Sequence, residues 1–137
     1  MTGLGIGLAM LVAMAPQSFE LWPDGNPGGW SVDGPEVRTE ENGILIVRNV
    51  NRPNVTFHAS PAAKTDAPCV LVVPGGGYHI LALGHEGTEV AEWLNANGFH
   101  AAVLKYRLPR EQDTAPRHAI SLQDAHRAMR LLREKAS

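Results

Sequence analysis

The middle of the chain holds two apolar runs separated by an amphipathic segment. Residues 69–73 (CVLVV) are apolar without a break, a pattern typical of a strand buried on both faces. Residues 85–97 carry acidic side chains toward their start, apolar ones on one face and a glycine after their end, which predicts a helix. Residues 99–106 (FHAAVLKY) form the second apolar run. This order predicts a βαβ unit with parallel strands and a right-handed crossover.

The flanking segments predict further elements. From about residue 116 to the end, apolar residues recur at spacings of three and four and predict a helix. Residues 43–50 (GILIVRNV) and 53–58 (PNVTFH) are short β-branched runs, which predict an antiparallel hairpin or two neighbouring strands. Residues 19–34 are rich in proline, glycine and aspartate and predict an irregular lead-in with turns.

The amino terminus carries an uncharged apolar run over residues 4–15. This run is shorter than the roughly 20 residues that a membrane-spanning helix needs, so we expect no stable membrane span. Its length suits the core of a signal peptide, and residues 13–15 have the small-x-small form of a cleavage site. However, no Lys or Arg precedes the run, and Pro16 would follow the cut. We expect residues 1–18 to be a signal peptide or an unstructured N-terminus. The protein is then exported to the periplasm or medium, with a cytoplasmic protein as the alternative.

Composition and charge narrow the function classes. A chain of 137 residues with 44% hydrophobic and 19% charged residues is typical of one soluble globular domain and excludes disordered and collagen-like classes. The formal net charge of −2 offers no broad surface for nucleic acid. A single cysteine, Cys69, excludes an internal disulfide.

The most informative motif is residues 74–78 (PGGGY), which follow the first apolar run. Consecutive glycines let the backbone approach a ligand closely and let its N–H groups converge. A phosphate-binding Walker loop would end in Gly-Lys-Ser/Thr, and the spaced glycines of a dinucleotide fingerprint would open a helix, so neither pattern fits. An oxyanion hole, in which backbone donors stabilise charge on a carbonyl oxygen, uses such a loop in lipases and esterases. A simple tight turn is the other interpretation.

Several separated motifs together resemble a known family. In order along the chain they are LWPDGNPGG, PGGGY, GHEGTEVAEWLNANGF, AVLKYRLP and LQDAHRAMRLLREKA. From residue 21 to the end, the chain resembles the N-terminal half of bacterial α/β-hydrolase esterases of the acetylxylan-esterase-like and feruloyl-esterase-like kind. The resemblance implies an α/β fold, specifically a partial α/β-hydrolase fold with N-terminal strands, a glycine oxyanion loop, a βαβ unit and a following helix. Residues 19–137 would be the N-terminal part of one such domain.

The resemblance also implies roles for the loop residues. The second and third glycines of the family's loop supply oxyanion N–H groups, which corresponds to Gly76 and Gly77 here. Tyr78, the next residue, is the candidate substrate contact. Lipases often begin this loop with histidine, where this chain has Pro74, so the loop must be braced differently.

The family's catalytic groups are missing from the sequence. The nucleophile of this fold stands in a Gly-x-Ser-x-Gly elbow, followed in the chain by the acid and the histidine, and no such pentapeptide occurs here. In the family, the helix that resembles residues 122–136 directly precedes the nucleophile strand. We therefore expect an N-terminal fragment, truncated before the nucleophile strand and inactive alone. Residues 69–73 would then form an exposed apolar edge, so we expect poor solubility or self-association.

Other polar and aromatic residues allow two interpretations each. The six histidines lack the His-Glu-x-x-His pattern, so we expect structural roles and no metal site. Arg107, after the second apolar run, is either structural or a substrate contact at the end of a strand. Trp22 and Trp30 either stack on a sugar or anchor turns.

Three functions remain open. The first is a serine ester hydrolase without cofactor, acting on acylated carbohydrate or small esters and lacking its catalytic half. The second is a non-catalytic remnant or binding module. The third is a small nucleotide-binding protein, although the glycine loop contains no Lys or Arg to neutralise phosphate.

Overall fold

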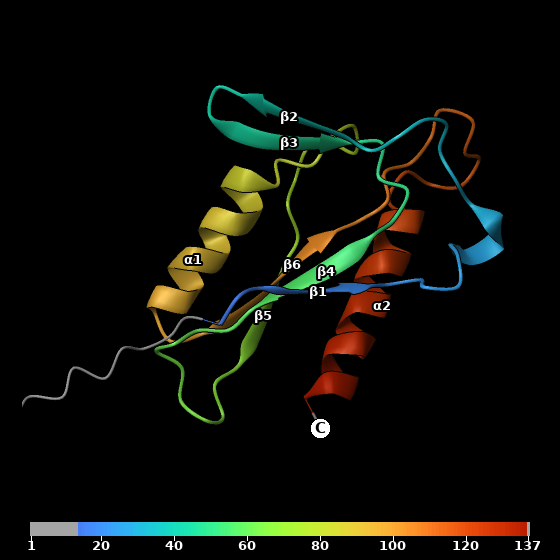
Figure 1. Ribbon diagram of the computed structural model, residues 1–137. Coiled ribbons are helices and arrows are strands. Elements are labelled where there is room, and N and C mark those ends of the chain that lie inside the picture. The colour runs from blue at the N-terminus through green and yellow to red at the C-terminus, as the bar shows by residue number, and fades with distance from the viewer. Residues whose placement is uncertain (1–13, 137) are drawn as a thin grey trace, which may run out of the picture.

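The structure, a computed structural model that describes residues 14–136, is a mixed α/β fold built on a four-stranded mixed sheet (Figure 1). In spatial order the strands are β1 (Gln17–Glu20), β4 (Asn54–His58), β6 (His100–Lys105) and β5 (Cys69–Val72). The strand β4 runs antiparallel to both β1 and β6, whereas β5 runs parallel to β6. The parallel pairing that the two apolar runs predict is confirmed.

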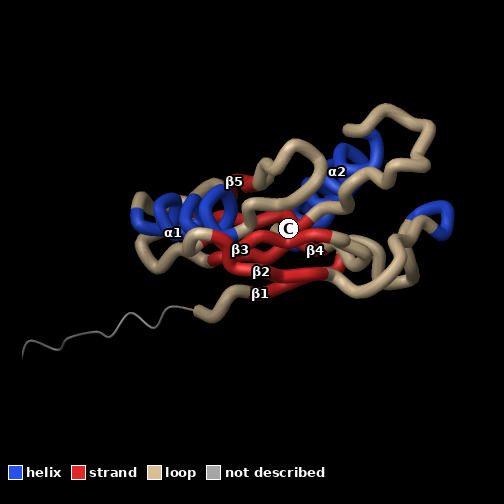
Figure 2. The backbone as a smooth tube through the Cα atoms, turned by 90° about the horizontal axis from the view of Figure 1, so that it is seen from above, coloured by secondary structure: helices blue, strands red, loops and turns tan. Residues whose placement is uncertain are grey.

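Two helices cover opposite faces of this sheet. They are α1 (Glu89–Ala96) and α2 (Ala119–Lys135), and Figure 2 shows the strands lying between them. Side chains alternate between the two faces along β6. Ala101 and Val103 pack in the core under α1, whereas Ala102 and Leu104 pack in the core that contains Ala128 of α2. A strand buried on both faces explains the apolar centre of β6, Ala101 to Leu104.

The crossover from β5 to β6 differs in detail from the expected single helix over residues 85–97. It begins with a π-helical turn, η2 (Gly84–Thr88), and α1 follows from Glu89. The helix ends as predicted, because Gly98 adopts the left-handed conformation with φ of 83°. The wider turn of η2 matters for the site described below.

The two β-branched runs do not pair with each other, so the predicted hairpin of residues 43–50 and 53–58 is wrong. Instead β3 (Ile44–Arg48) pairs with β2 (Val37–Glu41) in a separate two-stranded sheet, and β4 joins the main sheet. The β2–β3 connection is Asn42-Gly43, with φ of 52° and 78°, a sequence that favours the tight turn of a hairpin. This hairpin lies against η2 at the top of Figure 1.

The lead-in is more ordered than its composition predicts. Residues 17–20 form β1, so neither an unstructured segment up to residue 18 nor an irregular segment from residue 19 describes this stretch correctly. The remainder up to residue 34 is irregular as predicted, apart from the short helical turn η1 (Pro27–Gly29). Most of the predicted signal peptide lies outside the described residues. Within residues 14–136, no helix has the length and apolar character needed to cross a membrane.

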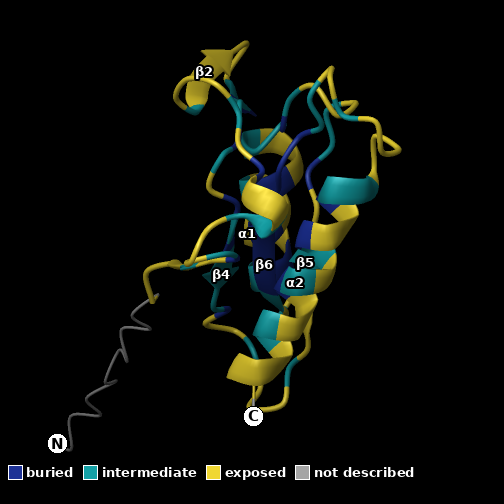
Figure 3. Ribbon diagram, turned by 90° about the vertical axis from the view of Figure 1, so that its right-hand side faces the viewer, coloured by how far each residue is buried: buried dark blue, intermediate teal, exposed yellow. Residues whose placement is uncertain are grey.

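The strand β5 lies at an edge of the sheet. The expectation that its residues are buried on both faces of the sheet is wrong. Cys69 and Val70 are exposed, and only Val72 is buried, whereas β6 fills the dark blue centre of Figure 3. Among the described residues no strand covers the outer side of β5. The expectation of an exposed apolar edge is therefore confirmed.

Candidate functional site

The glycine loop, residues 74–78, stands where β5 ends, beside the carboxyl end of β6. Pro74 is fully buried, and its carbonyl oxygen accepts a hydrogen bond of 2.5 Å from the hydroxyl of Tyr106, the residue after β6. Burial, and secondarily the nearby Tyr78 and Glu86 groups, raises the pKa of Tyr106. The neutral phenol therefore remains the donor that ties the start of the loop to the neighbouring strand.

The backbone of the loop requires glycine at its centre. Gly76 has φ of 148°, and a Cβ atom there would lie 2.0 Å from the carbonyl oxygen of Ile80. That close approach arises because the N–H groups of His79 and Ile80 both donate to the carbonyl oxygen of Gly76, at 3.1 and 3.3 Å. Gly77 is also left-handed, with φ of 62°, but a Cβ there would meet only His79, at 4.0 Å.

Three successive N–H groups of the loop are unpaired. Within residues 14–136, the amides of Gly76, Gly77 and Tyr78 donate to no acceptor. The first two are the predicted oxyanion donors. Unpaired donors at the carboxyl end of a strand are available to a ligand that enters at this edge of the sheet. Their role as an oxyanion hole stays a prediction.

The brace of the loop is a carboxylate that the sequence analysis missed. Glu86 of η2 accepts the N–H of Gly75 through Oε2 at 2.7 Å. Two glycines let η2 approach closely enough for this contact. A Cβ on Gly84 would lie 2.9 Å from the backbone nitrogen of Leu45, and one on Gly87 would lie 3.2 Å from Cγ of Pro74. The sequence Gly84-His85-Glu86-Gly87 was the available signal for this brace, because the glycines on either side allow close packing around one acidic residue.

Two cavities of different polarity meet at Tyr78. One, of about 230 Å³, is lined by Tyr78, His79, Arg110 and Glu111 together with the apolar Val50 and Leu108. The other, of about 240 Å³, is lined mainly by apolar groups and includes Val73, Tyr106 and Leu122. Tyr78 lines both cavities, so the predicted substrate contact does border open space next to the glycine loop.

Comparison with known proteins finds two relatives, an acetylxylan esterase and a xylanase, each matched over a small part of its own length. The chain is 37% identical over 67 residues to an acetylxylan esterase from Xylanibacter ruminicola, a match that covers 49% of this chain and 13% of the esterase. It is 39% identical to endo-1,4-beta-xylanase B from Butyrivibrio fibrisolvens over 91% of this chain and 21% of that protein. The sequence relation is therefore to an acetylxylan esterase and to a xylanase, over part of each. No protein-family model matches it.

Solved structures include partial matches to this chain. Each of two crystal structures, of an esterase/lipase from an uncultured bacterium and of EstE5-PMSF, aligns with 84% of this chain. The alignments cover 34% of the other chain at 17% identity, with TM-scores of 0.46. The chain spans about an eighth of the length of the acetylxylan esterase and about a fifth of the length of the xylanase.

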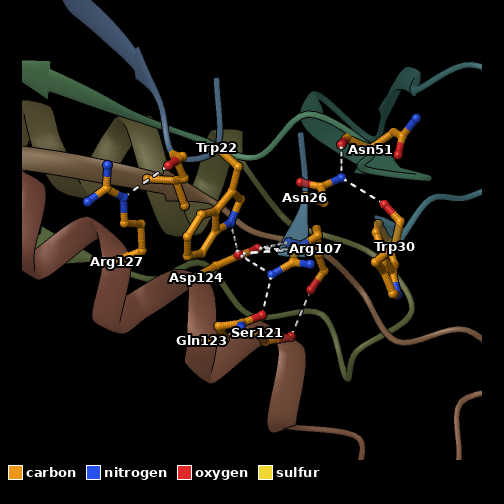
Figure 4. A network of polar contacts seen from close by, with 10 residues as sticks. Trp22, Asn26, Trp30, Asn51, Arg107, Ser121, Gln123, Asp124 and Arg127 are labelled. Atoms are coloured by element: carbon orange, nitrogen blue, oxygen red, sulfur yellow. Dashed lines mark hydrogen bonds and ion pairs between the residues drawn. The ribbon is translucent and has the colours of Figure 1, made fainter. Parts of the chain in front are cut away.

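A buried ion pair joins the segment after β6 to α2, and Trp22 of the amino-terminal segment contacts it (Figure 4). Arg107 and Asp124 are both fully buried, with 2.7 Å between Nη2 and Oδ1. The Trp22 indole also donates to Asp124 at 2.7 Å, and the Ser121 hydroxyl donates to the Arg107 carbonyl oxygen at 2.8 Å. Of the two interpretations of Arg107, the structural role is therefore the one supported.

The two tryptophans pack against arginine side chains. The guanidinium carbon of Arg107 lies 5.8 Å from the Trp22 ring centroid and 5.3 Å from that of Trp30. Arg127 and Arg110 add similar contacts, at 5.7 Å to Trp22 and 5.2 Å to Trp30. Cation–π contacts of this kind favour the interpretation that both indoles anchor turns.

The described part of the chain contains no group of three His, Cys, Asp or Glu side chains positioned to hold a metal ion. The closest pairing of this kind near the loop is His85 with Glu89, at 3.1 Å and solvent-exposed. Further along the chain, Arg110 and Asp113 form an ion pair. The hydrogen bond from Arg110 lowers the pKa of the Asp113 carboxyl below its usual value.

Proposed function

We propose that this chain forms the oxyanion-binding part of a serine carboxylic-ester hydrolase that acts on acylated carbohydrate or small esters. The observation that carries the proposal is the row of unpaired N–H groups at Gly76, Gly77 and Tyr78, beside the carboxyl end of β6. The sequence relation to an acetylxylan esterase supports the ester-hydrolase class. In this proposal residues 19–137 are the N-terminal part of an α/β-hydrolase domain, and residues 4–15 direct export.

The proposed chemistry assigns a specific step to the loop. A serine hydroxyl attacks the ester carbonyl, a histidine takes the proton, and the carbonyl oxygen becomes an oxyanion. The amides of Gly76 and Gly77 donate to that oxyanion. Each donor of this kind contributes about 10²–10³ in turnover. Because Glu86 and Tyr106 fix the first two residues of the loop, the donors are held in place before the charge develops.

The first experiment is to sequence the source DNA beyond codon 137 and express the polypeptide it encodes. We expect an open frame with a Gly-x-Ser-x-Gly elbow and hydrolysis of p-nitrophenyl acetate and acetylated xylan. A stop codon after Ser137 would overturn the esterase proposal and favour a non-catalytic binding module.

Two matched variants test the role of the loop in the encoded enzyme. Gly77→Ala and Gly29→Ala introduce the same Cβ at left-handed residues with φ of 62° and 66°, and neither Cβ meets an atom closer than 4.0 Å. The conformational free energy that alanine costs in a left-handed backbone is therefore similar in the two variants. We expect only Gly77→Ala to lower turnover, because strain at this left-handed residue displaces the N–H that alanine keeps, and only this N–H is a proposed oxyanion donor. Equal turnover in the two variants would contradict the assignment.

A further inference from the structure

We infer that the polar cavity beside the glycine loop binds one sugar ring, the alcohol half of the ester, and that Tyr78 separates this ring from the acyl half. The inference rests on the proposed function and names the substrate class of the same site. It concerns the cavity of about 230 Å³ lined by Tyr78, His79 and Glu111.

The polar side chains around this cavity fall into two groups. Asn49 and Arg110 are committed to the protein: the Asn49 amide donates to three backbone carbonyls, and Arg110 pairs with Asp113 at 2.6 Å. The side chains of Tyr78, His79 and Glu111 make no hydrogen bond within residues 14–136 and are exposed. A phenol, an imidazole and a carboxylate provide donors and acceptors for several hydroxyl groups at once.

The size and floor of the cavity also suit one sugar ring. Cavities that hold drug-sized ligands begin at about 300 Å³, so this smaller one fits a single ring better than a longer ligand. Val50 and Leu108 are buried at its wall. They provide an apolar surface for the C–H groups of a sugar, while the unpaired polar groups meet its hydroxyls.

Tyr78 lies between the two cavities. Its φ of 64° is left-handed, a conformation that costs conformational energy for any residue with a side chain. This residue lines both the polar cavity and the apolar one that contains Val73 and Leu122. An ester whose carbonyl oxygen accepts from the Gly76 and Gly77 amides lies next to Tyr78, and we place one half of the ester on each side of this residue. The hydroxylated half matches the polar side, and the acyl half matches the apolar side.

The inference is tested on the 137-residue chain carrying Val70→Lys, a charge on the open edge of β5 that opposes self-association, since sugar binding needs no catalytic serine. The ¹⁵N-labelled chain is titrated with methyl β-D-xylopyranoside and, separately, with cyclohexanol, a ring of the same size with a single hydroxyl. We expect saturable amide shifts at Tyr78, His79 and Glu111 with a Kd in the millimolar range for the sugar only. Shifts centred on Val73 and Leu122, or no saturable shift with the sugar, would overturn the inference.

Variants with matched controls locate the binding. His79→Ala and Glu111→Gln are expected to weaken sugar affinity roughly five- to tenfold, the loss expected for one hydrogen bond. His126→Ala and Glu40→Gln change the same residue types at exposed positions elsewhere and are expected to leave the affinity unchanged. Equal affinities across all four variants would overturn the assignment of the cavity.

Failure of the inference is distinguishable from failure of the proposed function. If the encoded protein hydrolyses p-nitrophenyl acetate while this chain shows no sugar-induced shift, the sugar subsite is overturned and the esterase proposal is supported. If the sugar shifts His79 and Glu111 while no ester is hydrolysed, the sugar site is supported and the esterase proposal is overturned.

Discussion

The carboxylate of Glu86 accepts the N–H of Gly75 at 2.7 Å, across eleven residues of chain. This contact occupies the first amide of the glycine loop, whereas the next three amides, of Gly76, Gly77 and Tyr78, are unpaired within the described residues. Lipases often begin this loop with histidine, where this chain has Pro74. Here the Glu86 carboxylate of η2 braces the loop instead. The brace is local to the loop, which makes it testable in this chain.

Glu86→Ala should loosen the loop without unfolding the domain. The exposed carboxylate contributes one charge-assisted hydrogen bond, so we expect exchange of the Gly75 amide to accelerate roughly fivefold, equivalent to about 1 kcal/mol. Hydrogen exchange followed by NMR measures this directly. Glu89→Ala is the matched control, because Glu89 is an exposed glutamate of the same crossover that pairs with His85 instead. Unchanged exchange at Gly75 in Glu86→Ala would show that the carboxylate does not brace the loop.

Alanine at the two central glycines should have graded effects on stability. At Gly76 the new Cβ would overlap the Ile80 carbonyl oxygen, so the loop must rearrange. At Gly77 the space is open, and only the left-handed backbone is penalised, by about 1 kcal/mol. Urea unfolding should therefore rank Gly76→Ala as clearly less stable than Gly77→Ala. The reverse order would mean that the loop has a different conformation in solution.

The sequence predicted the parts of the fold whose side chains are buried. A largely apolar run marks β6 because both of its faces are covered, and the stripe of α2 marks the face that packs on the sheet. The missed strands lack such a signal. All five residues of β2 are exposed. Its sequence, VRTEE, contains a single apolar residue, so neither face of the strand is apolar. The Asn42-Gly43 turn was the one local indication that residues 37–48 form a hairpin.

Apolar character does not reveal whether a strand has neighbours on both sides. The runs of β5 and β6 look alike in sequence, yet β6 pairs on both sides and β5 on one among the described residues. Within the site, three consecutive glycines predicted an unusual backbone conformation, which Gly76 and Gly77 adopt. Glu86 was not, because its contact depends on how closely η2 approaches Pro74 and β3 in three dimensions.

Asp124→Ala should be among the most damaging substitutions in this chain. It would leave the fully buried Arg107 guanidinium without its carboxylate, and removing one partner of a buried pair costs about 3–5 kcal/mol. Urea unfolding followed by tryptophan fluorescence measures the loss, since Trp22 contacts Asp124. Asp113→Ala, which breaks the more exposed pair with Arg110, is the control and should cost about 1 kcal/mol or less. Equal losses in the two variants would contradict the role of burial.

Stability should fall at alkaline pH through Tyr106. Burial raises the pKa of this phenol above its ordinary value near 10, so the folded state binds the proton more tightly than the unfolded state. The resulting stability is fully present below the unfolded pKa and is lost as pH rises through the folded pKa. We expect the urea midpoint to fall above about pH 10. Tyr106→Phe should lose about 1 kcal/mol at neutral pH, with a smaller alkaline decline. Tyr78→Phe, at the exposed tyrosine, is the control, and an alkaline decline that persists in Tyr106→Phe would contradict the assignment.

The open edge of β5 should make the 137-residue chain self-associate. Its outer backbone groups lack partners among the described strands, and Val70 and Val73 are 37% and 50% exposed beside them. Such an edge pairs readily with another strand, and a charged side chain on it opposes that pairing. Analytical ultracentrifugation should therefore show concentration-dependent association that Val70→Lys reduces. Val90→Lys introduces the same charge at an equally exposed valine of α1 and should leave the association unchanged. A monodisperse, cooperatively unfolding monomer at all concentrations would show that the edge is protected in solution.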